Sequence, residues 1–323
     1  MTASAGQGAL VRLENVGKTY RGLRRRVRAV ADVTLEMQAG EVFGLAGPNG
    51  AGKSTLIALL LGFLKPSTGA IRIAGVAPRE FVERHGVGYL SELVTIPPRW
   101  RLEEALSRYA LLAGIEGAHV DARVEELVVM LGLTEHWGKQ VRQLSKGSLQ
   151  RVGLAQALLH NEEVIILDEP THGLDPLWTQ RFRDIVRSLR QADRLILIAS
   201  HNLDELQRVA DRVAIIDHGR VQRVVRTRAV ADTGAASPYR LVIARGFEDA
   251  RALLRHAHPI AHDELEIPAL SLVELNALLR ALLERGVLVA SVTPMYSSLE
   301  RQFREVVSDA EGDERPRTAG ANE

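Results

Sequence analysis

The feature that most restricts how this 323-residue chain can fold is the octapeptide Gly47-Pro48-Asn49-Gly50-Ala51-Gly52-Lys53-Ser54. It matches the pattern G-x-x-x-x-G-K-[ST], in which backbone N–H groups and a lysine enclose nucleotide phosphates. Residues 41–46 resemble a strand ahead of it and residues 54–64 a helix after it, the context that the motif requires. A chance glycine turn, the alternative, would leave this context unexplained.

The loop predicts the chemistry of individual residues. Lys53 should neutralise charge on the β- and γ-phosphates, and the Ser54 hydroxyl should ligate Mg²⁺. The glycines allow the backbone N–H groups to turn inward. We therefore assign the nucleotide-binding site to Gly47, Pro48, Asn49, Gly50, Ala51, Gly52, Lys53, Ser54 and Thr55.

A pair of carboxylates follows a second apolar run. Residues 164–167 are continuously apolar, as expected of a strand buried on both faces, and Asp168-Glu169 comes directly after them. At the carboxyl end of a strand the chain leaves the sheet, so both side chains can face the crevice there. We expect Asp168 to hold the Mg²⁺ shell and Glu169 to polarise the attacking water. Taken alone, the pair could equally cap a helix; the phosphate-binding loop favours the catalytic interpretation.

The pattern of the whole chain predicts two domains. From Leu10 to about Val230, short β-branched runs alternate with longer helical stretches, which indicates an α/β fold with a parallel central sheet. A hairpin is expected over residues 213–221, with its turn at Gly219. The predicted boundaries are a flexible N-terminus at 1–9, an α/β domain at 10–230, a linker at 231–237, a small α+β domain at 238–308 and a disordered tail at 309–323. In the small domain, Leu272, Leu275, Leu279 and Leu282 share one helix face, which we interpret as core rather than as a dimer seam.

Composition excludes several classes of function. Forty-one Lys and Arg balance 40 Asp and Glu, so net charge gives no argument for a nucleic-acid partner or an anionic membrane surface. The chain has no cysteine, which excludes disulfides and thiolate metal sites. Its longest apolar runs fall short of the roughly 18 to 20 residues of a spanning helix, so another chain must cross any membrane at which this one acts.

Leu144-Ser145-Lys146-Gly147-Ser148-Leu149-Gln150-Arg151 lies ahead of the acidic strand and opens a helical stretch. It resembles the signature motif of ABC ATPases, and the order of phosphate loop, signature and acidic strand is that of the family. The resemblance covers about residues 10–230. It implies a P-loop NTPase fold with a mixed central sheet and a helical subdomain, and a protein that binds ATP with Mg²⁺ and hydrolyses ATP.

In this family the signature motif contacts phosphate from a second subunit. The resemblance therefore implies that Ser145 and Gly147 act across a homodimer, or a dimer with a similar ATPase subunit. Lys146 stands where the family usually has another glycine, and its role stays open. Asp175, in the loop at residues 171–176, would couple the two sites across the dimer.

Three further positions fit the family pattern. His201, one residue beyond the apolar run 195–199 and Ser200, is where the family places the histidine that contacts the γ-phosphate, although a lone histidine there would more often face solvent. Tyr20 fits the aromatic residue that stacks on adenine; a packed core tyrosine is the alternative. Glu92 replaces the usual glutamine that senses Mg²⁺ and the transmembrane partner, and its charge would either strengthen a cation contact or repel the γ-phosphate.

Glutamate at this position is familiar in one exporter branch, and residues 298–303 resemble a short C-terminal motif of that branch. The resemblance thus implies the ATP-hydrolysing subunit of an ABC exporter, peripheral on the cytoplasmic face of the membrane. Residues 92–109 would meet a separate integral-membrane permease. The alternative is a soluble ABC ATPase acting on ribosomes or nucleic acid. Such proteins usually carry two cassettes or a long coiled-coil insertion, and this sequence has one cassette and no such insertion. We expect no nucleic-acid partner.

Overall fold

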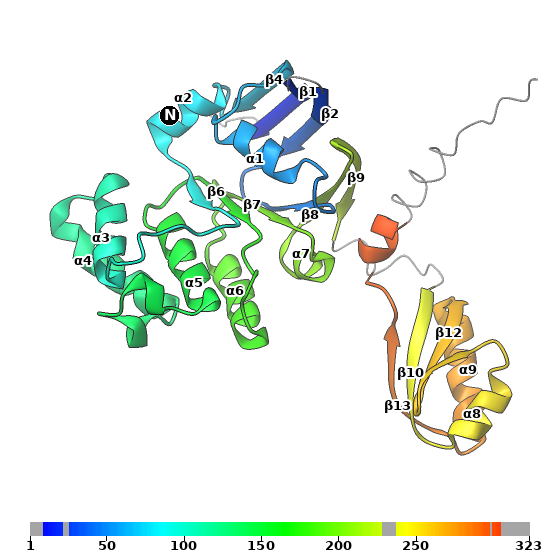
Figure 1. The fold of residues 1–323 in the computed structure, drawn as a ribbon. Helices are drawn as coiled ribbons and strands as arrows, with labels where there is room; N and C mark the ends of the chain where they lie inside the picture. The colour runs from blue at the N-terminus through cyan, green and yellow to red at the C-terminus, as the bar shows by residue number, and fades with distance from the viewer. Residues whose placement is uncertain (1–8, 22–25, 228–236, 298, 305–323) are drawn as a thin grey trace, which may run out of the picture. The chain divides into compact units, whose positions relative to one another are not determined.

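The structure is a computed structural model that describes residues 9–21, 26–227, 237–297 and 299–304 (Figure 1). The chain divides into two compact units, residues 1–227 and 228–323. Most of the predicted N-terminus, linker and tail, as well as Ser298 of the C-terminal motif, lie outside the described residues, so the predicted domain boundaries stay predictions. Among the described helices, none combines the length and the apolar character needed to cross a membrane.

A six-stranded sheet forms the centre of the first unit, with the strand order β5-β6-β7-β3-β8-β9. Its first five strands run parallel and β9 is antiparallel to β8, so the sheet is mixed. The predicted hairpin accounts for this, because His218 and Gly219 both have positive φ (47° and 75°) and return the chain in two residues. The strands are β3 (Val42–Ala46), β5 (Gly88–Leu90), β6 (Val164–Asp168), β7 (Leu195–Ser200), β8 (Arg212–Asp217) and β9 (Arg220–Arg226). Every residue of β3, β6 and β7 is buried, which the continuous apolar runs predicted for β6 and β7.

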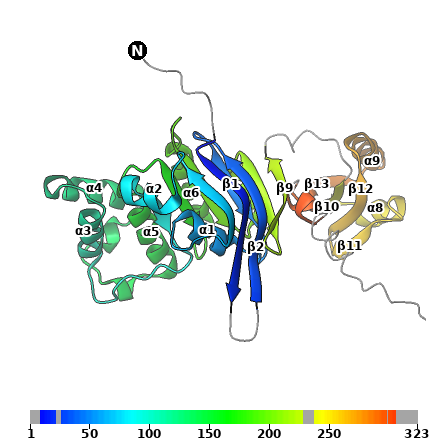
Figure 2. The same cartoon turned by 90° about the horizontal axis from the view of Figure 1, so that it is seen from above.

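A second, antiparallel sheet has the order β2-β1-β4, from β1 (Val11–Arg21), β2 (Arg26–Met37) and β4 (Thr68–Ile73). One hydrophobic core joins this sheet to the central sheet and includes the buried side of α1 (Lys53–Leu60). Figure 2 shows α1 beside β1 and β2. The helix that follows the phosphate-binding loop is therefore anchored on two sheets.

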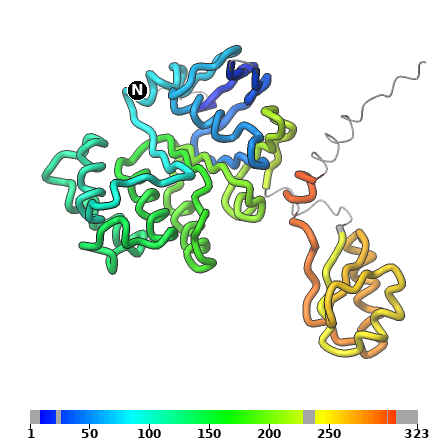
Figure 3. Tube along the Cα trace, in the orientation of Figure 1, coloured from blue at the N-terminus to red at the C-terminus, as the bar shows by residue number. Residues whose placement is uncertain are grey.

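Helices fill the long connection between β5 and β6. They are α3 (Leu102–Leu112), α4 (Gly117–Met130), the 3₁₀ turns η1 (Thr134–His136) and η2 (Val141–Gln143), and α5 (Lys146–Ala157). This is the helical subdomain that the resemblance implied, and Figure 3 traces it as a continuous segment. Gly153 of α5 lies against the segment after β5, since a Cβ there would be 2.5 Å from Val94 Cγ2 and 2.8 Å from Leu90 Cδ1. The remaining helices of the first unit are α2 (Pro78–His85), α6 (Pro176–Ser188) and α7 (Leu203–Val209).

The described part of the second unit contains a four-stranded antiparallel sheet, two helices between its strands, and a helical stretch at residues 299–304. Its elements are β10 (Ser237–Arg245), α8 (Phe247–Leu253), β11 (His258–Ala261), β12 (Glu264–Leu270), α9 (Leu272–Glu284) and β13 (Leu288–Pro294), and its strand order is β11-β12-β10-β13. This is the split β-α-β-β-α-β arrangement. Leu275 and Leu282 of the leucine stripe are buried in its core, and Leu279 packs against that core. Leu272 is 55% exposed, so its placement in the core was wrong, because it begins α9 directly after the N-cap Ser271.

Candidate functional site

The turn between β3 and α1 is shaped for close backbone approach. A Cβ at Gly47 would lie 2.4 Å from the Ile216 carbonyl oxygen, and one at Gly52, whose φ is 106°, would lie 2.4 Å from the Ala29 carbonyl oxygen. Both positions therefore require glycine. Gly52 is also the N-cap of α1 and provides no side-chain cap, so the first-turn N–H groups of α1 are available to an anion.

Lys53 lies over this loop rather than in solvent. It is 7% exposed, and its ammonium donates hydrogen bonds to the Gly47 and Pro48 carbonyl oxygens, at 2.7 and 3.3 Å. The same Nζ is 3.9 Å from Glu169 Oε1. The lysine charge is thus held between the loop and the carboxylate that directly follows β6.

Parallel pairing of β6 with β7 brings the acidic pair and the histidine together. Asp168 pairs with Ala199, and the Glu169 N–H donates to the Ala199 carbonyl at 2.8 Å. Glu169 adopts the left-handed conformation, with φ of 48°, and is 6% exposed. Hydrogen bonds from Ser200, which ends β7, and from His201, which follows it, hold the two carboxylate oxygens.

The contacts of the Glu169 carboxylate leave one lone pair available, on Oε2. Glu169 Oε1 accepts from the His201 N–H at 2.9 Å and lies 2.9 Å from His201 Nδ1, whereas Oε2 accepts from the Ser200 hydroxyl at 3.0 Å. Within the described part of the chain Oε2 has this one donor, so it can still accept a hydrogen from water. The alternative that Asp168 and Glu169 cap a helix is wrong, since the next helix, α6, has Asp175 as its N-cap.

Asp168 is a carboxylate in an environment that disfavours its charge. Burial raises its pKa to about 6, and the negative charges of Glu92 and Glu169 add to this, against the opposing effects of Lys53 and of a hydrogen bond with Ser54. A divalent cation would offset this excess negative charge, and a hydroxyl with a carboxylate is a donor set that suits Mg²⁺. Among the described residues no group of three or more His, Cys, Asp or Glu side chains could hold a metal alone. The residues therefore fit Mg²⁺ that is also bound by phosphate and water.

Replacement of Asp168 by asparagine should stabilise the nucleotide-free, metal-free protein at neutral pH. The raised pKa means that the folded state binds a proton more tightly than the unfolded state, whose Asp pKa is near 3.8. The stability that Asp168 contributes is therefore complete below about pH 3.8 and is lost as pH rises through about 6. We expect the variant to melt a few degrees higher than wild type at pH 7.5, and the difference to shrink as pH falls toward 4. Thermal melts in EDTA across this range measure it, and a difference that does not depend on pH would contradict the cause.

The signature residues lie outside this pocket. The pocket is lined by the loop and by Ala29, Thr55, Glu92, Asp168 and Glu169. Ser145 is instead the N-cap of α5, where its hydroxyl accepts from the Ser148 N–H at 3.1 Å. Gly147 packs against the following loop, because a Cβ there would be 2.9 Å from the Gly173 carbonyl oxygen. One chain thus brings the phosphate loop, both carboxylates, Glu92 and His201 together, but not Ser145, Gly147 and Asp175.

Tyr20 and Asp175 have local roles that the sequence did not reveal. Tyr20 is 41% exposed and its hydroxyl is 3.5 Å from Thr55 Oγ1, so the packed-core alternative is wrong and the ring is accessible beside the loop. Adenine stacking stays a prediction. The Asp175 carboxylate accepts from the Trp178 N–H at 2.8 Å and caps α6.

Two residues near Glu169 escaped the sequence reasoning. Gln150 Nε2 donates to the Glu169 carbonyl at 3.1 Å and to the Pro170 carbonyl at 3.3 Å, which ties the signature helix to the end of β6. Ser200 orients the Glu169 carboxylate. For Gln150 the only signal was its position within the signature octapeptide, and for Ser200 its position directly before His201.

The chain is similar to several known proteins. A family model described as ABC transporter matches residues 30–172. The chain is 40% identical over 220 residues to an uncharacterized ABC transporter ATP-binding protein of Nostoc sp., an alignment that covers 65% of this chain and 64%, less than two thirds, of that relative. It is 33% identical to the ABC transporter ATP-binding protein NatA of Bacillus subtilis, in an alignment that covers 66% of this chain and 87% of NatA. It is 31% identical to the methionine import ATP-binding protein MetN of Bordetella pertussis, in an alignment that covers 91% of this chain and 82% of MetN.

Two solved structures have similar folds. One is an ATP-binding cassette solved as a dimer in a post-hydrolysis state bound to ADP and Pi; it superposes with a TM-score of 0.63 at 24% identity and covers 68% of this chain and 99% of its own. The other is an ATP-binding subunit of an ABC transporter, with a TM-score of 0.61, 28% identity and coverage of 68% and 91%. At its level of identity, the first likeness concerns the fold alone.

Proposed function

Because this chain belongs to the family of ABC transporter ATP-binding proteins and is an ABC-type ATPase, we propose that two copies close around two ATP molecules and drive a separate membrane permease. The observation that carries the proposal is the incomplete pocket. One chain offers the loop, Lys53 and a fixed carboxylate, whereas Ser145 and Gly147 stand at a helix N-terminus outside the pocket. A second copy, or a similar ATPase subunit, would supply that turn.

In this proposal each residue acts on ATP from the position described. The loop N–H groups and Lys53 bind the phosphates, and Ser54 and Asp168 would hold Mg²⁺, which supplies charge neutralisation when it is bound with ATP. Glu169 Oε2 accepts a hydrogen from the attacking water, and the hydrogen bonds from Ser200 and His201 keep the carboxylate in place. The His201 side chain is 58% exposed, its Nδ1 lies 2.9 Å from Glu169 Oε1, and it would contact the γ-phosphate.

We propose residues 92–109 as the face that meets the permease. Leu93 is 80% exposed, and Trp100 lies nearby in the sequence with the Arg108 guanidinium 4.5 Å above its ring. An exposed apolar residue beside an aromatic–cation pair is a composition typical of interfaces. The protein would then be peripheral on the cytoplasmic face of the membrane.

An exporter is the more specific form of the proposal. Its support is Glu92, together with the motif at residues 298–303. A relative whose name specifies methionine import is similar over nearly the whole chain, so the direction of transport needs its own test. ATP-dependent movement of a candidate cargo into inverted vesicles that contain the permease would support export, and movement out of them would contradict it.

Mixing two inactive variants tests the composite site. Lys53→Met should disable nucleotide binding, and Ser145→Arg should block the turn that reaches the other subunit. In a mixed dimer one site contains both defects and the other contains neither. We expect each variant alone to be inactive and an equal mixture to recover about a quarter of wild-type phosphate release, since half of randomly assorted dimers are mixed and each has one intact site.

The control is co-purification of Lys53→Met carrying one affinity tag with Ser145→Arg carrying another, which reports how freely subunits exchange. If exchange occurs and the two variants together remain inactive, the proposal of two complete sites built across a dimer is wrong. The soluble alternative predicts activity that responds to ribosomes or nucleic acid and does not change when a permease is present.

A further inference from the structure

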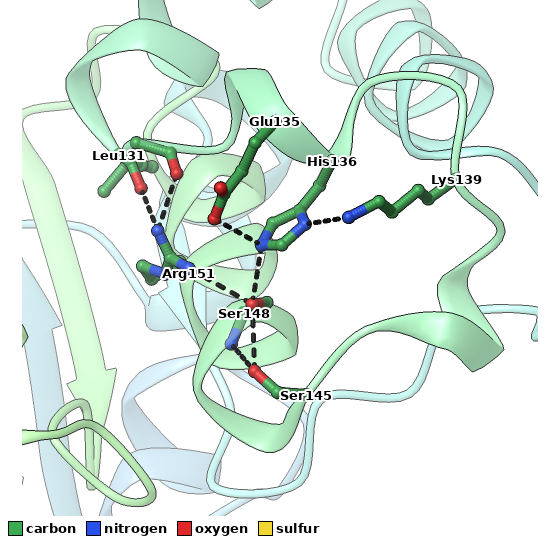
Figure 4. Close-up of polar contacts among 8 residues, drawn as sticks. Leu131, Glu135, His136, Lys139, Ser145, Ser148 and Arg151 are labelled. Atoms are coloured by element: carbon green, nitrogen blue, oxygen red, sulfur yellow. Dashed lines mark hydrogen bonds and ion pairs between the residues drawn. The ribbon is translucent and has the colours of Figure 1, made fainter.

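A network of four polar side chains lies beneath the signature turn (Figure 4). Its centre is Ser148, which is 3% exposed. The Ser148 hydroxyl oxygen is 2.9 Å from Ser145 Oγ, 2.9 Å from His136 Nε2 and 3.1 Å from Arg151 Nη2. None of these three contacts is the N-cap hydrogen bond of α5. That bond runs from the Ser148 N–H to Ser145 Oγ.

The neighbours of His136 determine which ring nitrogen carries hydrogen. Nδ1 is 3.3 Å from Lys139 Nζ, which can only donate, so Nδ1 accepts. Nε2 is 3.6 Å from Glu135 Oε1, which can only accept when ionised. Burial lowers the pKa of His136, as do the charges of Lys139 and Arg151, against the opposing charge of Glu135, so the ring is neutral at physiological pH. The tautomer with hydrogen on Nε2 satisfies both neighbours.

Arg151 is the second donor to Ser148, and it is fixed. Its Nη1 donates to the Leu131 and Gly132 carbonyl oxygens at 2.9 and 2.7 Å, and its guanidinium lies 4.0 Å from the Trp178 ring centre. Nη2 then points at the Ser148 hydroxyl. Arginine has no acceptor, so this hydrogen bond has one possible direction.

These two donors set the direction of the remaining bond. A hydroxyl has two lone pairs, and those of Ser148 are occupied by the His136 and Arg151 hydrogens. The Ser148 hydrogen therefore goes to Ser145 Oγ, which also accepts from the Ser148 N–H. Both lone pairs of Ser145 are then filled. Its own hydrogen has no acceptor among the described residues, and the side chain is exposed.

We propose that His136 and Arg151 are positioning residues that compel the Ser145 hydroxyl to donate to a phosphate oxygen of the nucleotide bound by a second copy of the chain. The inference rests on the proposed dimeric site. A phosphate oxygen can only accept, so a serine presented as a donor binds it, whereas the same serine presented as an acceptor repels it. His136 lies nine residues before Ser145 and is outside the signature octapeptide.

A pair of nearly isosteric substitutions separates this role from a purely structural one. His136→Gln keeps an N–H donor in reach of Ser148 and preserves the direction of the network. His136→Glu places an acceptor there, so the Ser148 hydrogen turns to it, and the Ser145 hydrogen turns back to Ser148. The carboxylate introduced lies near Lys139 and Arg151, which favour its charge, so the fold should be retained.

The readouts on the full chain are the kcat of phosphate release and ATP-dependent dimerisation in the Glu169→Gln background. We expect His136→Glu to weaken both by about tenfold to hundredfold, the scale of one hydrogen bond to a charged group, and His136→Gln by no more than about threefold. Equal losses in the two variants would mean that His136 fills space only, and would overturn the inference. Should either variant melt well below wild type, Ser148→Ala and Ser148→Thr replace them, with loss expected for alanine alone.

The Ser145→Ala background distinguishes the two levels of the argument. With the hydroxyl removed, His136→Glu should have no further effect on either readout. If Ser145→Ala itself leaves dimerisation and turnover unchanged, the proposed dimeric site fails. If Ser145→Ala is harmful but His136→Glu alone is harmless, the dimeric site stands and the role of the network is wrong.

Discussion

The Glu169→Gln variant is expected to hydrolyse ATP about 10²- to 10³-fold more slowly than wild type, while binding ATP as tightly. Glutamine has the same shape, and its amide oxygen can still accept the hydrogen bond that Glu169 Oε1 receives from the His201 N–H. What is lost is an anionic oxygen at the place of Oε2 that can take a proton from water. The defect should therefore appear in kcat and leave nucleotide affinity intact.

Single-turnover phosphate release and binding of a fluorescent ATP analogue measure the two quantities separately. Glu163→Gln is the matched control, because Glu163 is an exposed glutamate six residues earlier in the chain. It should behave as wild type in both assays. Unchanged turnover in Glu169→Gln would remove Glu169 from the chemistry and leave the ordering of β7 as its role.

Arg194→Met is expected to reduce the free energy of unfolding by about 3–5 kcal/mol without a direct effect on the nucleotide site. Arg194 is 3% exposed just before β7, and its guanidinium donates to the Glu162 and Leu189 carbonyl oxygens, both at 2.9 Å, and to Asn161 Oδ1 at 2.5 Å. The side chain thus joins the approach to β6 with the end of α6. Methionine fills much of the volume but leaves these acceptors without donors, and each buried unsatisfied acceptor costs about 1–3 kcal/mol.

Urea denaturation of the isolated variant measures the change in stability. Arg187→Met is the control, since Arg187 pairs with Asp184 on the exposed surface of α6 and both side chains are about 60% exposed. We expect this control to remain within about 0.5 kcal/mol of wild type. A small effect for Arg194→Met would mean that water satisfies the freed carbonyl groups.

The parts of the site that the sequence predicted are those with local signals. The phosphate loop has fixed spacing, and β6 and β7 are continuous apolar runs that end in polar residues. The hairpin was predictable because glycine marks a turn in which two successive residues have positive φ. The mixed sheet and the helical subdomain came from the family resemblance rather than from these patterns.

The residues that the sequence did not predict depend on contacts between distant segments. Ser200 became visible as a partner of Glu169 only once β6 and β7 were aligned, with Asp168 opposite Ala199. His136 belongs to a 3₁₀ turn outside every motif and reaches Ser148 by folding back over α5. Leu272 shows the opposite error, because periodicity continued the apolar stripe into the first turn of α9, where the residue is solvent-exposed.

The close fit at Gly153 has a mechanical consequence. Because no room remains for even a methyl group between α5 and Val94, a displacement of the segment that contains Glu92 must carry α5 with it or open a void in a packed interior. A push received from a membrane protein at that segment would then shift the turn that begins with Ser145. Gly153→Ala would force these parts aside, and in the proposed complex we expect it to weaken the link between ATP hydrolysis and the permease.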